Sequence, residues 1–348
     1  MLKSQKKICI LSRSIDFRNK LLHLELSKRI EIDFLVIYPN NCRTTQIQSI
    51  PDLSKYQTII STLRVGIYAE NPKFSDYLKS LKTKILYYPE SFDHLYPSLF
   101  PSRGYCKKLD LPAGIIDKYL LYGPDHVNMA KKHLPPAETK EVGFLKLDYL
   151  RTMSKEVTRD EKILLCLSPL KKIKGFHEAF LAEKLSERFG NQLWIRNYPV
   201  RSEALDLTPY LKYNIKIQNE LEIDGEISKN NYDKYAKTLA SSGVVINIAG
   251  SPLLEAMSLN IPCVCPMIPG LHIGDENDQL NLYELADSEN SHYRAIQLRE
   301  HCYLPNTYDE VISQTEIALN IKERKVNTIK NLVGMMDGKT IERIINEL

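Results

Sequence analysis

The sequence predicts an α/β protein built from two doubly wound domains. Short apolar segments rich in β-branched residues alternate with segments of helical period, and this alternation occurs twice along the 348 residues. Such alternation is typical of a mostly parallel sheet with helices on both faces. The length suits two domains, and a hydrophobic content of 43% is ordinary for a globular protein.

Residues 1–152 are expected to form the N-terminal domain. Apolar runs predict strands and amphipathic runs predict helices in this half. The expected strands are 8–11, 32–38, 58–62, 85–88 and 118–122, and the expected helices are 16–29, 75–81 and a segment ending at 132. The polar stretch 151–162 is expected to be a linker.

Residues 153–326 are expected to repeat this architecture as a C-terminal domain. Residues 327–348 are expected to form an amphipathic helix that packs back towards the first domain. The expected strands of the second half are 163–167, 192–196, 214–218 and 244–248, and the expected helices are 175–189, 231–240 and 307–320.

The most informative stretch of the chain is 242–265. A buried-type strand at 244–248 leads through a Gly250-Ser251 turn into a short helix. Ser251 is a suitable N-cap, and Pro252 then occupies the first helical position. Backbone N–H groups and the helix dipole make such a turn an anion site. Glu255, about one turn later, can accept hydrogen bonds from a sugar hydroxyl.

This phrase, G-S-x-x-x-E-A followed by Pro262, resembles the donor-binding segment of GT-B-type glycosyltransferases. The resemblance implies two Rossmann-like domains that face a central cleft. It also implies that Gly250, Ser251 and Pro252 lie at the donor phosphate and that Glu255 contacts the ribose. The same superfamily includes sugar-nucleotide epimerases and glycerophosphate transferases. A plain strand–turn–helix connection with a capping Ser and a solvated Glu is the alternative.

Two further phrases are similar to those of related transferases. Gly143 and Asp148 match a "V-G-x-x-x-x-D" phrase that ends the first domain in several GT-B families. The segment from Asp337 to Arg343 matches a "D-G-x-x-x-x-R-I" ending found in bacterial surface-polysaccharide and glycerophosphate transferases. Tyr198 stands where the glycerophosphate transferases carry a phosphate-binding His, which weakens that closer match.

Basic residues follow two expected strands of the second half. Ser168, Lys171 and Lys172 follow the strand at 163–167, and Arg196 ends the next one. Carboxyl ends of parallel strands lie at one sheet edge, where ligands bind in doubly wound folds. We therefore expect these four residues to help hold a nucleotide diphosphate. A solvated basic loop is the alternative for the lysines.

The loop after the strand at 85–88 holds the candidates for catalysis. A transferase that inverts the configuration at the anomeric carbon of the sugar needs a base that takes the proton of the acceptor hydroxyl. Glu90 is the first choice, with His94 and Asp93 behind it, and a solvated acidic turn is the alternative. Weaker candidates for contact with the acceptor or a phosphate are Ser12, Arg13, Ser14 and His292.

Composition excludes several other classes. A net charge of +4 is too mild to indicate a nucleic-acid partner, although it fits anionic substrates or an acidic membrane surface. The seven cysteines form neither a CxxC pair nor a disulfide framework, and Cys9, Cys166, Cys263 and Cys265 are expected in the core. Standard dinucleotide, P-loop, hydrolase and zinc-protease motifs are absent from the sequence. We expect no cofactor and no metal ion.

The resemblance thus implies a metal-independent glycosyltransferase. Its donor is a nucleotide-activated sugar, and its acceptor is a growing bacterial surface glycan, such as capsule or lipopolysaccharide, or a lipid-linked saccharide. The alternatives are a CDP-glycerol-type glycerophosphotransferase, a sugar-nucleotide epimerase and a non-catalytic nucleotide-sugar-binding module. The sequence predicts a cytoplasmic location, including the inner face of the cytoplasmic membrane.

Overall fold

The chain divides into two compact units. The first contains the described residues up to Asp148 and those from Lys330 onward, and the second contains those from Tyr149 to Ile329. The computed structural model describes residues 7–13, 17–37, 47, 49–89, 111–167, 173–174, 178–197, 215–218, 228–248, 250–268, 272–273, 280–281, 302–321 and 329–348. None of the helices within these ranges is long and apolar enough to cross a membrane.

The first unit contains a six-stranded sheet in the order β2-β1-β3-β4-β5-β6, and every pair in it is parallel. The order of the strands reverses between β1 and β3, so the carboxyl ends of these two strands mark the switch point of this sheet. The strands are β1 (Ile8–Ser12), β2 (Asp33–Val36), β3 (Thr58–Ser61), β4 (Lys84–Tyr87), β5 (Lys118–Leu121) and β6 (Glu138–Glu141).

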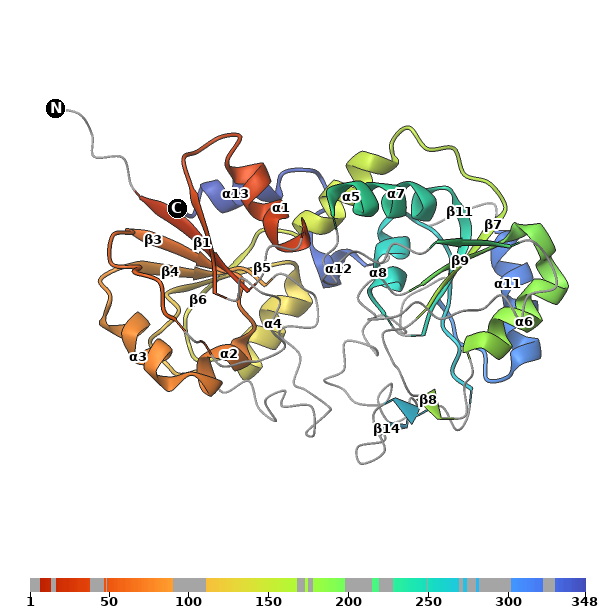
Figure 1. Cartoon of the computed structure of the whole chain (residues 1–348), viewed down its shortest axis with the longest axis horizontal. Coiled ribbons are helices and arrows are strands. Elements are labelled where there is room, and N and C mark those ends of the chain that lie inside the picture. Colours follow the sequence, from red (N-terminus) through yellow and green to blue (C-terminus); the bar gives the residue numbers. More distant parts are fainter. Residues whose placement is uncertain are drawn as a thin grey trace. The chain divides into compact units, whose positions relative to one another are not determined.

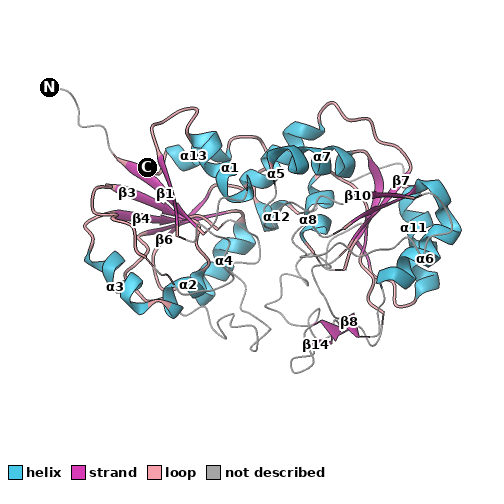
Figure 2. Cartoon of the chain, in the orientation of Figure 1, coloured by secondary structure: helices cyan, strands magenta, loops and turns pink. Residues whose placement is uncertain are grey.

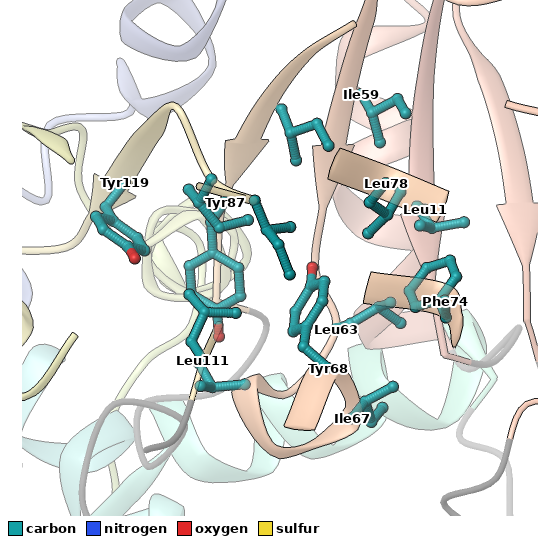
Figure 3. Close-up of a cluster of buried hydrophobic side chains, with 14 of the residues drawn as sticks. Leu11, Ile59, Leu63, Ile67, Tyr68, Phe74, Leu78, Tyr87, Leu111 and Tyr119 are labelled. Carbon is teal, nitrogen blue, oxygen red and sulfur yellow. The ribbon is translucent and has the colours of Figure 1, made fainter. Parts of the chain in front are cut away.

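Helices cover both faces of this sheet. Figure 1 shows α2 (Val65–Glu70), α3 (Pro72–Ser80) and α4 (Pro124–His133) on one face, and α1 (Phe17–Leu26) on the other. The apolar core lies between the sheet and α2 and α3. Figure 3 shows side chains from both layers meeting there, among them Leu11, Ile59, Leu63, Tyr68 and Phe74.

The second unit contains another six-stranded parallel sheet, in the order β10-β9-β7-β11-β12-β15. Counted along the chain this is 3-2-1-4-5-6, the order typical of dinucleotide-binding folds, with its switch point between β7 and β11. The strands are β7 (Lys162–Cys166), β9 (Leu193–Arg196), β10 (Lys216–Gln218), β11 (Ser242–Ile246), β12 (Cys263–Val264) and β15 (Cys302–Tyr303).

Helices again cover both faces. Figure 2 shows α7 (Lys229–Ala240) and α8 (Ser251–Ser258) on one side of the strands, with α6 (Glu178–Phe189) and α11 (Tyr308–Leu319) on the other. A small antiparallel sheet joins β8 (Ile173–Lys174), β13 (His272–Ile273) and β14 (Leu280–Asn281). The four cysteines that were expected in the core are buried.

Two expectations about local structure are wrong. The stretch 151–162 is not a linker throughout, because α5 (Leu145–Ser154) extends through its first residues and β7 begins at Lys162. Residues 327–348 do not form one helix: α12 (Lys330–Val333) and α13 (Thr340–Ile345) are separate. Gly334 and Gly338 break the helix with φ of +77° and +79°, a conformation outside the right-handed helical region.

The C-terminal residues are fastened to the first unit through Asp148. One carboxylate oxygen of Asp148 accepts a hydrogen bond from the Gly338 N–H at 3.0 Å. The other accepts from the Thr340 hydroxyl at 2.6 Å and from the Thr340 N–H at 3.3 Å. Arg343 adds a bond to the Val142 carbonyl oxygen at 3.3 Å. We call this arrangement the C-terminal clasp; it satisfies N–H groups at the start of α13.

The family-like phrases at 143–148 and 337–343 are therefore parts of one structural contact. Asp148 comes from the first phrase, whereas Gly338 and Arg343 come from the second. Within the second phrase, Arg343 also pairs with Asp337 at 2.5 Å. Packing within the first unit is thus enough to explain why these residue types occur together.

Gly334→Ala should destabilise the protein far more than Gly338→Ala. Both residues have nearly the same positive φ, which costs a side chain about 1–2 kcal/mol. A Cβ at Gly334 would lie 2.0 Å from the Tyr122 carbonyl oxygen, whereas a Cβ at Gly338 would meet no atom within 4 Å. We expect losses in the free energy of unfolding of about 3 kcal/mol or more and about 1 kcal/mol respectively, measured by urea titration with circular dichroism. Equal losses would contradict the close approach of residues 122 and 334.

Candidate functional site

The turn between β11 and α8 is held by the side chain of Asn247. Its Oδ1 accepts a hydrogen bond from the Gly250 N–H at 2.7 Å, and its Nδ2 donates to the Cys166 carbonyl oxygen at 2.7 Å. The Asn247 N–H donates to the Val264 carbonyl oxygen at 3.1 Å. One buried residue thereby ties β11 to β7 and β12 at the switch point of the sheet, where this class of fold binds its ligands.

The start of α8 differs in detail from the sequence prediction. The helix begins at Ser251, so Gly250 is its N-cap and Pro252 is its second residue; Ser251 is not the cap. The reason is local: a Cβ at Gly250 would lie 2.5 Å from Asn247 Oδ1, so the turn needs glycine at this position. Ser251 is exposed, while Gly250 and Pro252 are half-buried. The first helical residues of α8 can therefore be reached by a ligand.

The far end of α8 is fixed by a cation. Arg159 donates hydrogen bonds to the carbonyl oxygens of Leu259 and Asn260, which follow the last turn of the helix. A positive charge at a helix C-terminus complements the helix dipole. Because Asn247 holds one end and Arg159 the other, the N-terminus of α8 has a fixed direction.

Three side chains from three elements meet beside this turn. Glu255 on α8 accepts a hydrogen bond from the Tyr235 hydroxyl on α7 at 2.5 Å. The guanidinium carbon of Arg196, at the end of β9, lies 3.8 Å from the centre of the Tyr235 ring. All three residues are buried, with 3%, 2% and 6% of Glu255, Tyr235 and Arg196 exposed. Burial, together with the negative charge of Glu255, raises the pKa of Tyr235 well above its usual value.

The structure differs in two respects from a plain strand–turn–helix connection, the alternative interpretation of this stretch. It required a capping Ser251 and a solvated Glu255, whereas Gly250 is the cap and Glu255 is buried and hydrogen-bonded. Arg196 lies within the same cluster as Glu255, through Tyr235. The roles of these residues in donor binding stay predictions.

Several candidates lie outside the described residues. Among those expected at the donor these are Ser168, Lys171 and Lys172; the three candidate bases, Glu90, Asp93 and His94, are outside as well, as are Ser14 and His292.

Hydrogen bonds and ring stacking fix the segment that follows β4, just before Glu90. The Tyr122 hydroxyl donates to the Pro89 carbonyl oxygen, and the Tyr122 ring stacks on Phe144 with 3.9 Å between ring centres. The Tyr88 hydroxyl donates to the Gly143 carbonyl oxygen at 3.2 Å. The expected base thus follows a segment whose last described residue is fixed by hydrogen bonding.

The other first-unit candidates lie at the switch point of the first sheet. Ser12 is the last residue of β1 and is buried, and its carbonyl oxygen accepts a hydrogen bond from the Ile37 N–H at 3.0 Å. Arg13 follows it and is half-buried. Ligand contact at these two residues stays a prediction.

Solved structures with this architecture span nearly the whole chain. A UDP-N-acetylglucosamine 2-epimerase matches with a TM-score of 0.57 and 14% identity, covering 99% of this chain and 95% of its own. The UDP-GlcNAc 2-epimerase of Neisseria meningitidis, bound to UDP-GlcNAc, matches with a TM-score of 0.55 and 12% identity, and the match covers 98% of each chain. The wall teichoic acid polymerase TagF matches with a TM-score of 0.53 and 12% identity, and the match covers 98% of this chain and 88% of the TagF chain.

The chain has a GT-B-like fold. The predicted fold class, two Rossmann-like α/β domains, is thereby confirmed. At these identities the likeness establishes the fold and not the activity. No protein family model matches the sequence, and no curated protein is recognisably similar to it.

Asn247 and Tyr235 are the residues that sequence reasoning missed. Asn247 had a signal, because a polar residue directly after an apolar strand, three positions before a glycine, suits a side chain that bonds to the turn. Tyr235 had no such signal in the sequence. Nothing in the residue pattern of α7 indicates that the Tyr235 hydroxyl contacts the carboxylate of Glu255, twenty residues later.

Asn247→Ala should destabilise the second unit by about 2–4 kcal/mol, because the buried Cys166 carbonyl oxygen and the half-buried Gly250 N–H each lose a hydrogen bond. Trp194, the only tryptophan, lies on β9 of the same unit, so its fluorescence during urea unfolding is a suitable measurement. The control is Asn320→Ala, an exposed amide bonded to the Glu316 carbonyl oxygen, with an expected loss below about 1 kcal/mol. A similar small loss for Asn247→Ala would show that the amide does not hold the turn.

Proposed function

We propose that this protein binds a nucleotide-activated sugar through its second unit and transfers the sugar to a growing bacterial surface glycan or lipid-linked saccharide. The observation that carries the proposal is the convergence of three groups near one sheet edge: the N-terminus of α8 at Ser251, the Arg196 guanidinium and the Glu255 carboxylate. The first two suit a diphosphate and the third suits ribose hydroxyls, which are hydrogen-bond donors.

The fold likeness supports a nucleotide-sugar ligand. One solved structure of this fold is an epimerase bound to UDP-GlcNAc, and it matches nearly the whole of this chain. In our proposal the diphosphate lies at the Ser251 helix N-terminus with Arg196 beside it. Lys171 and Lys172 add charge that stabilises the departing nucleotide, which needs no metal ion for this purpose.

The acceptor and the catalytic base are assigned to the first unit. In an inverting transfer, a base removes the proton of the acceptor hydroxyl as its oxygen attacks the sugar carbon and the bond to the nucleotide breaks. Glu90 is our candidate for that base because it directly follows Pro89, whose carbonyl is fixed by Tyr122. Well-placed bases of this kind contribute about 10²–10⁴-fold to a rate.

Two other chemistries have specific observations in their favour. Epimerisation of a sugar nucleotide is favoured by the likeness to UDP-GlcNAc 2-epimerases over 98–99% of the chain. Glycerophosphate transfer is favoured by the likeness to TagF. The sequence argument for the latter is weaker, because the tail phrase is accounted for by the C-terminal clasp and Tyr198 replaces the expected His.

Product analysis separates these chemistries. The full chain is incubated with UDP-GlcNAc or CDP-glycerol, with and without a lipid-linked saccharide. Acceptor-dependent release of a nucleoside diphosphate, with sugar added to the acceptor, supports glycosyl transfer. A changed sugar without an acceptor indicates epimerisation, and CMP release indicates glycerophosphate transfer. Tight nucleotide binding without any product would instead fit a binding module.

Glu255→Gln should weaken nucleotide binding about 10- to 100-fold without unfolding the protein. The change removes the charge from a hydrogen bond to ribose, and charged hydrogen bonds contribute about 1.5–3 kcal/mol. Calorimetric titration with UDP and CDP gives the dissociation constants. Glu316→Gln, a change at an exposed carboxylate on α11, is the control. An unchanged affinity with a native-like melting curve would remove Glu255 from the ligand site.

Glu90→Gln should abolish turnover while nucleotide affinity stays within about twofold, since a base acts in the transition state. Asp93→Asn and His94→Ala are the matched changes in the same loop. Loss of activity in one of these, with full activity in Glu90→Gln, would move the base by three or four residues. Full activity in all three variants would exclude the loop from the mechanism.

A further inference from the structure

The carboxylate of Glu255 accepts a hydrogen bond from a phenol on the neighbouring helix. Its Oε2 lies 2.5 Å from the Tyr235 hydroxyl, a short distance typical of a hydrogen bond to a charged acceptor. Because Glu255 is buried, the loss of this donor would cost free energy, so the bond favours one orientation of the side chain. The rotamer of Glu255 therefore depends on the position of Tyr235.

Tyr235 is itself held from the other side. The Arg196 guanidinium packs on the face of its ring, with 3.8 Å between the guanidinium carbon and the ring centre. A guanidinium stacked on an aromatic ring is an attractive cation–π arrangement, and it is stronger where water is excluded. A tyrosine is protonated at neutral pH, and the raised pKa of Tyr235 reinforces this, so its hydroxyl can donate to Glu255. Tyr235 thus connects the candidate phosphate-binding cation to the candidate ribose-binding carboxylate.

This connection has a consequence for ligand selection. An ionised carboxylate has about four acceptor positions, of which Tyr235 occupies one, and a hydroxyl of a ligand is a donor that suits another. A vicinal diol offers two such donors. A site built to hydrogen-bond a hydroxyl strongly rejects an analogue that lacks it, since the buried polar group then loses its partner. The rejection is strong only if the carboxylate is held in place before the ligand binds.

We propose that Tyr235 is a positioning residue that orients Glu255 towards the ribose, so that the second unit selects ribonucleotides over deoxyribonucleotides. The inference rests on the proposed function, in which Glu255 meets the ribose, and deepens it by assigning the selectivity to a residue on another helix. If Tyr235 only satisfies a structural carboxylate, its loss lowers stability but leaves the ratio of ribonucleotide to deoxyribonucleotide affinity unchanged.

The test is calorimetric titration of the full chain with UDP, CDP and their 2′-deoxy and 3′-deoxy forms. The variant is Tyr235→Phe, which removes the hydroxyl and keeps the ring that packs on Arg196. Tyr232→Phe removes the same atom one turn earlier on α7 and is the matched control. Because Tyr235→Phe removes a partner of a buried charge, Tyr235→Phe is also made together with Glu255→Gln, which removes that charge.

We expect wild type and Tyr232→Phe to prefer the ribonucleotide at least about tenfold. Tyr235→Phe should bind the ribonucleotide about 5- to 20-fold more weakly and lose most of the preference, since the deoxy forms never used the carboxylate fully. In the Glu255→Gln background, adding Tyr235→Phe should change affinity less than about twofold.

Contrary outcomes separate this inference from the proposed function. A full ribose preference in Tyr235→Phe, or a further independent loss in the Glu255→Gln background, would overturn the role of Tyr235 and leave nucleotide binding intact. Binding of ribo and deoxy forms with equal affinity by wild type would overturn ribose selection. Absence of any nucleotide binding by wild type would overturn the proposed function and this inference with it.

Discussion

The second unit depends on the two hydrogen bonds of the Asn247 side chain. Parallel strands that flank a switch point have no turn between them, so some other group must fix their carboxyl ends and the helix that follows. The Asn247 amide does both: its N–H end bonds to β7 and its oxygen bonds to the Gly250 N–H. With Arg159 at the opposite end, α8 is held in a direction that keeps Glu255 within reach of Tyr235. The proposed ligand chemistry follows from that fixed helix.

The first unit uses a comparable device for a different purpose. Asp148, next to the boundary between the units, accepts three hydrogen bonds from residues 338–340. The C-terminus adds Glu347, which pairs with Lys118 at 2.6 Å, so the pKa of Glu347 is lowered. Residues that resemble transferase motifs in this region thus hold the chain together. A phrase shared with a family can reflect the packing of its fold as readily as its chemistry.

The order and type of most elements could be predicted from the sequence, because buried parallel strands contain continuous apolar runs such as 8–11 and 163–166. The strand at Glu138–Glu141 escaped prediction because it is polar and, among the described strands, pairs with β5 alone at the edge of the sheet. The Gly250-Ser251 turn and Glu255 could be predicted from the local residue pattern, in which an apolar strand is followed by Gly, Ser and Pro and then by Glu. The contact of Glu255 with Tyr235 could not be found, since it depends on how α7 and α8 pack, which no periodicity encodes.

In the proposed function, a nucleotide binds at the N-terminus of α8, beside Arg196 and Glu255. Hydrogen–deuterium exchange of the full chain, with and without saturating UDP or CDP, tests it most directly because exchange reports on individual backbone segments. We expect added protection in peptides that cover 247–258 and 193–197. Binding of the nucleotide with unchanged exchange in both peptides, or with protection only in the first unit, would contradict it.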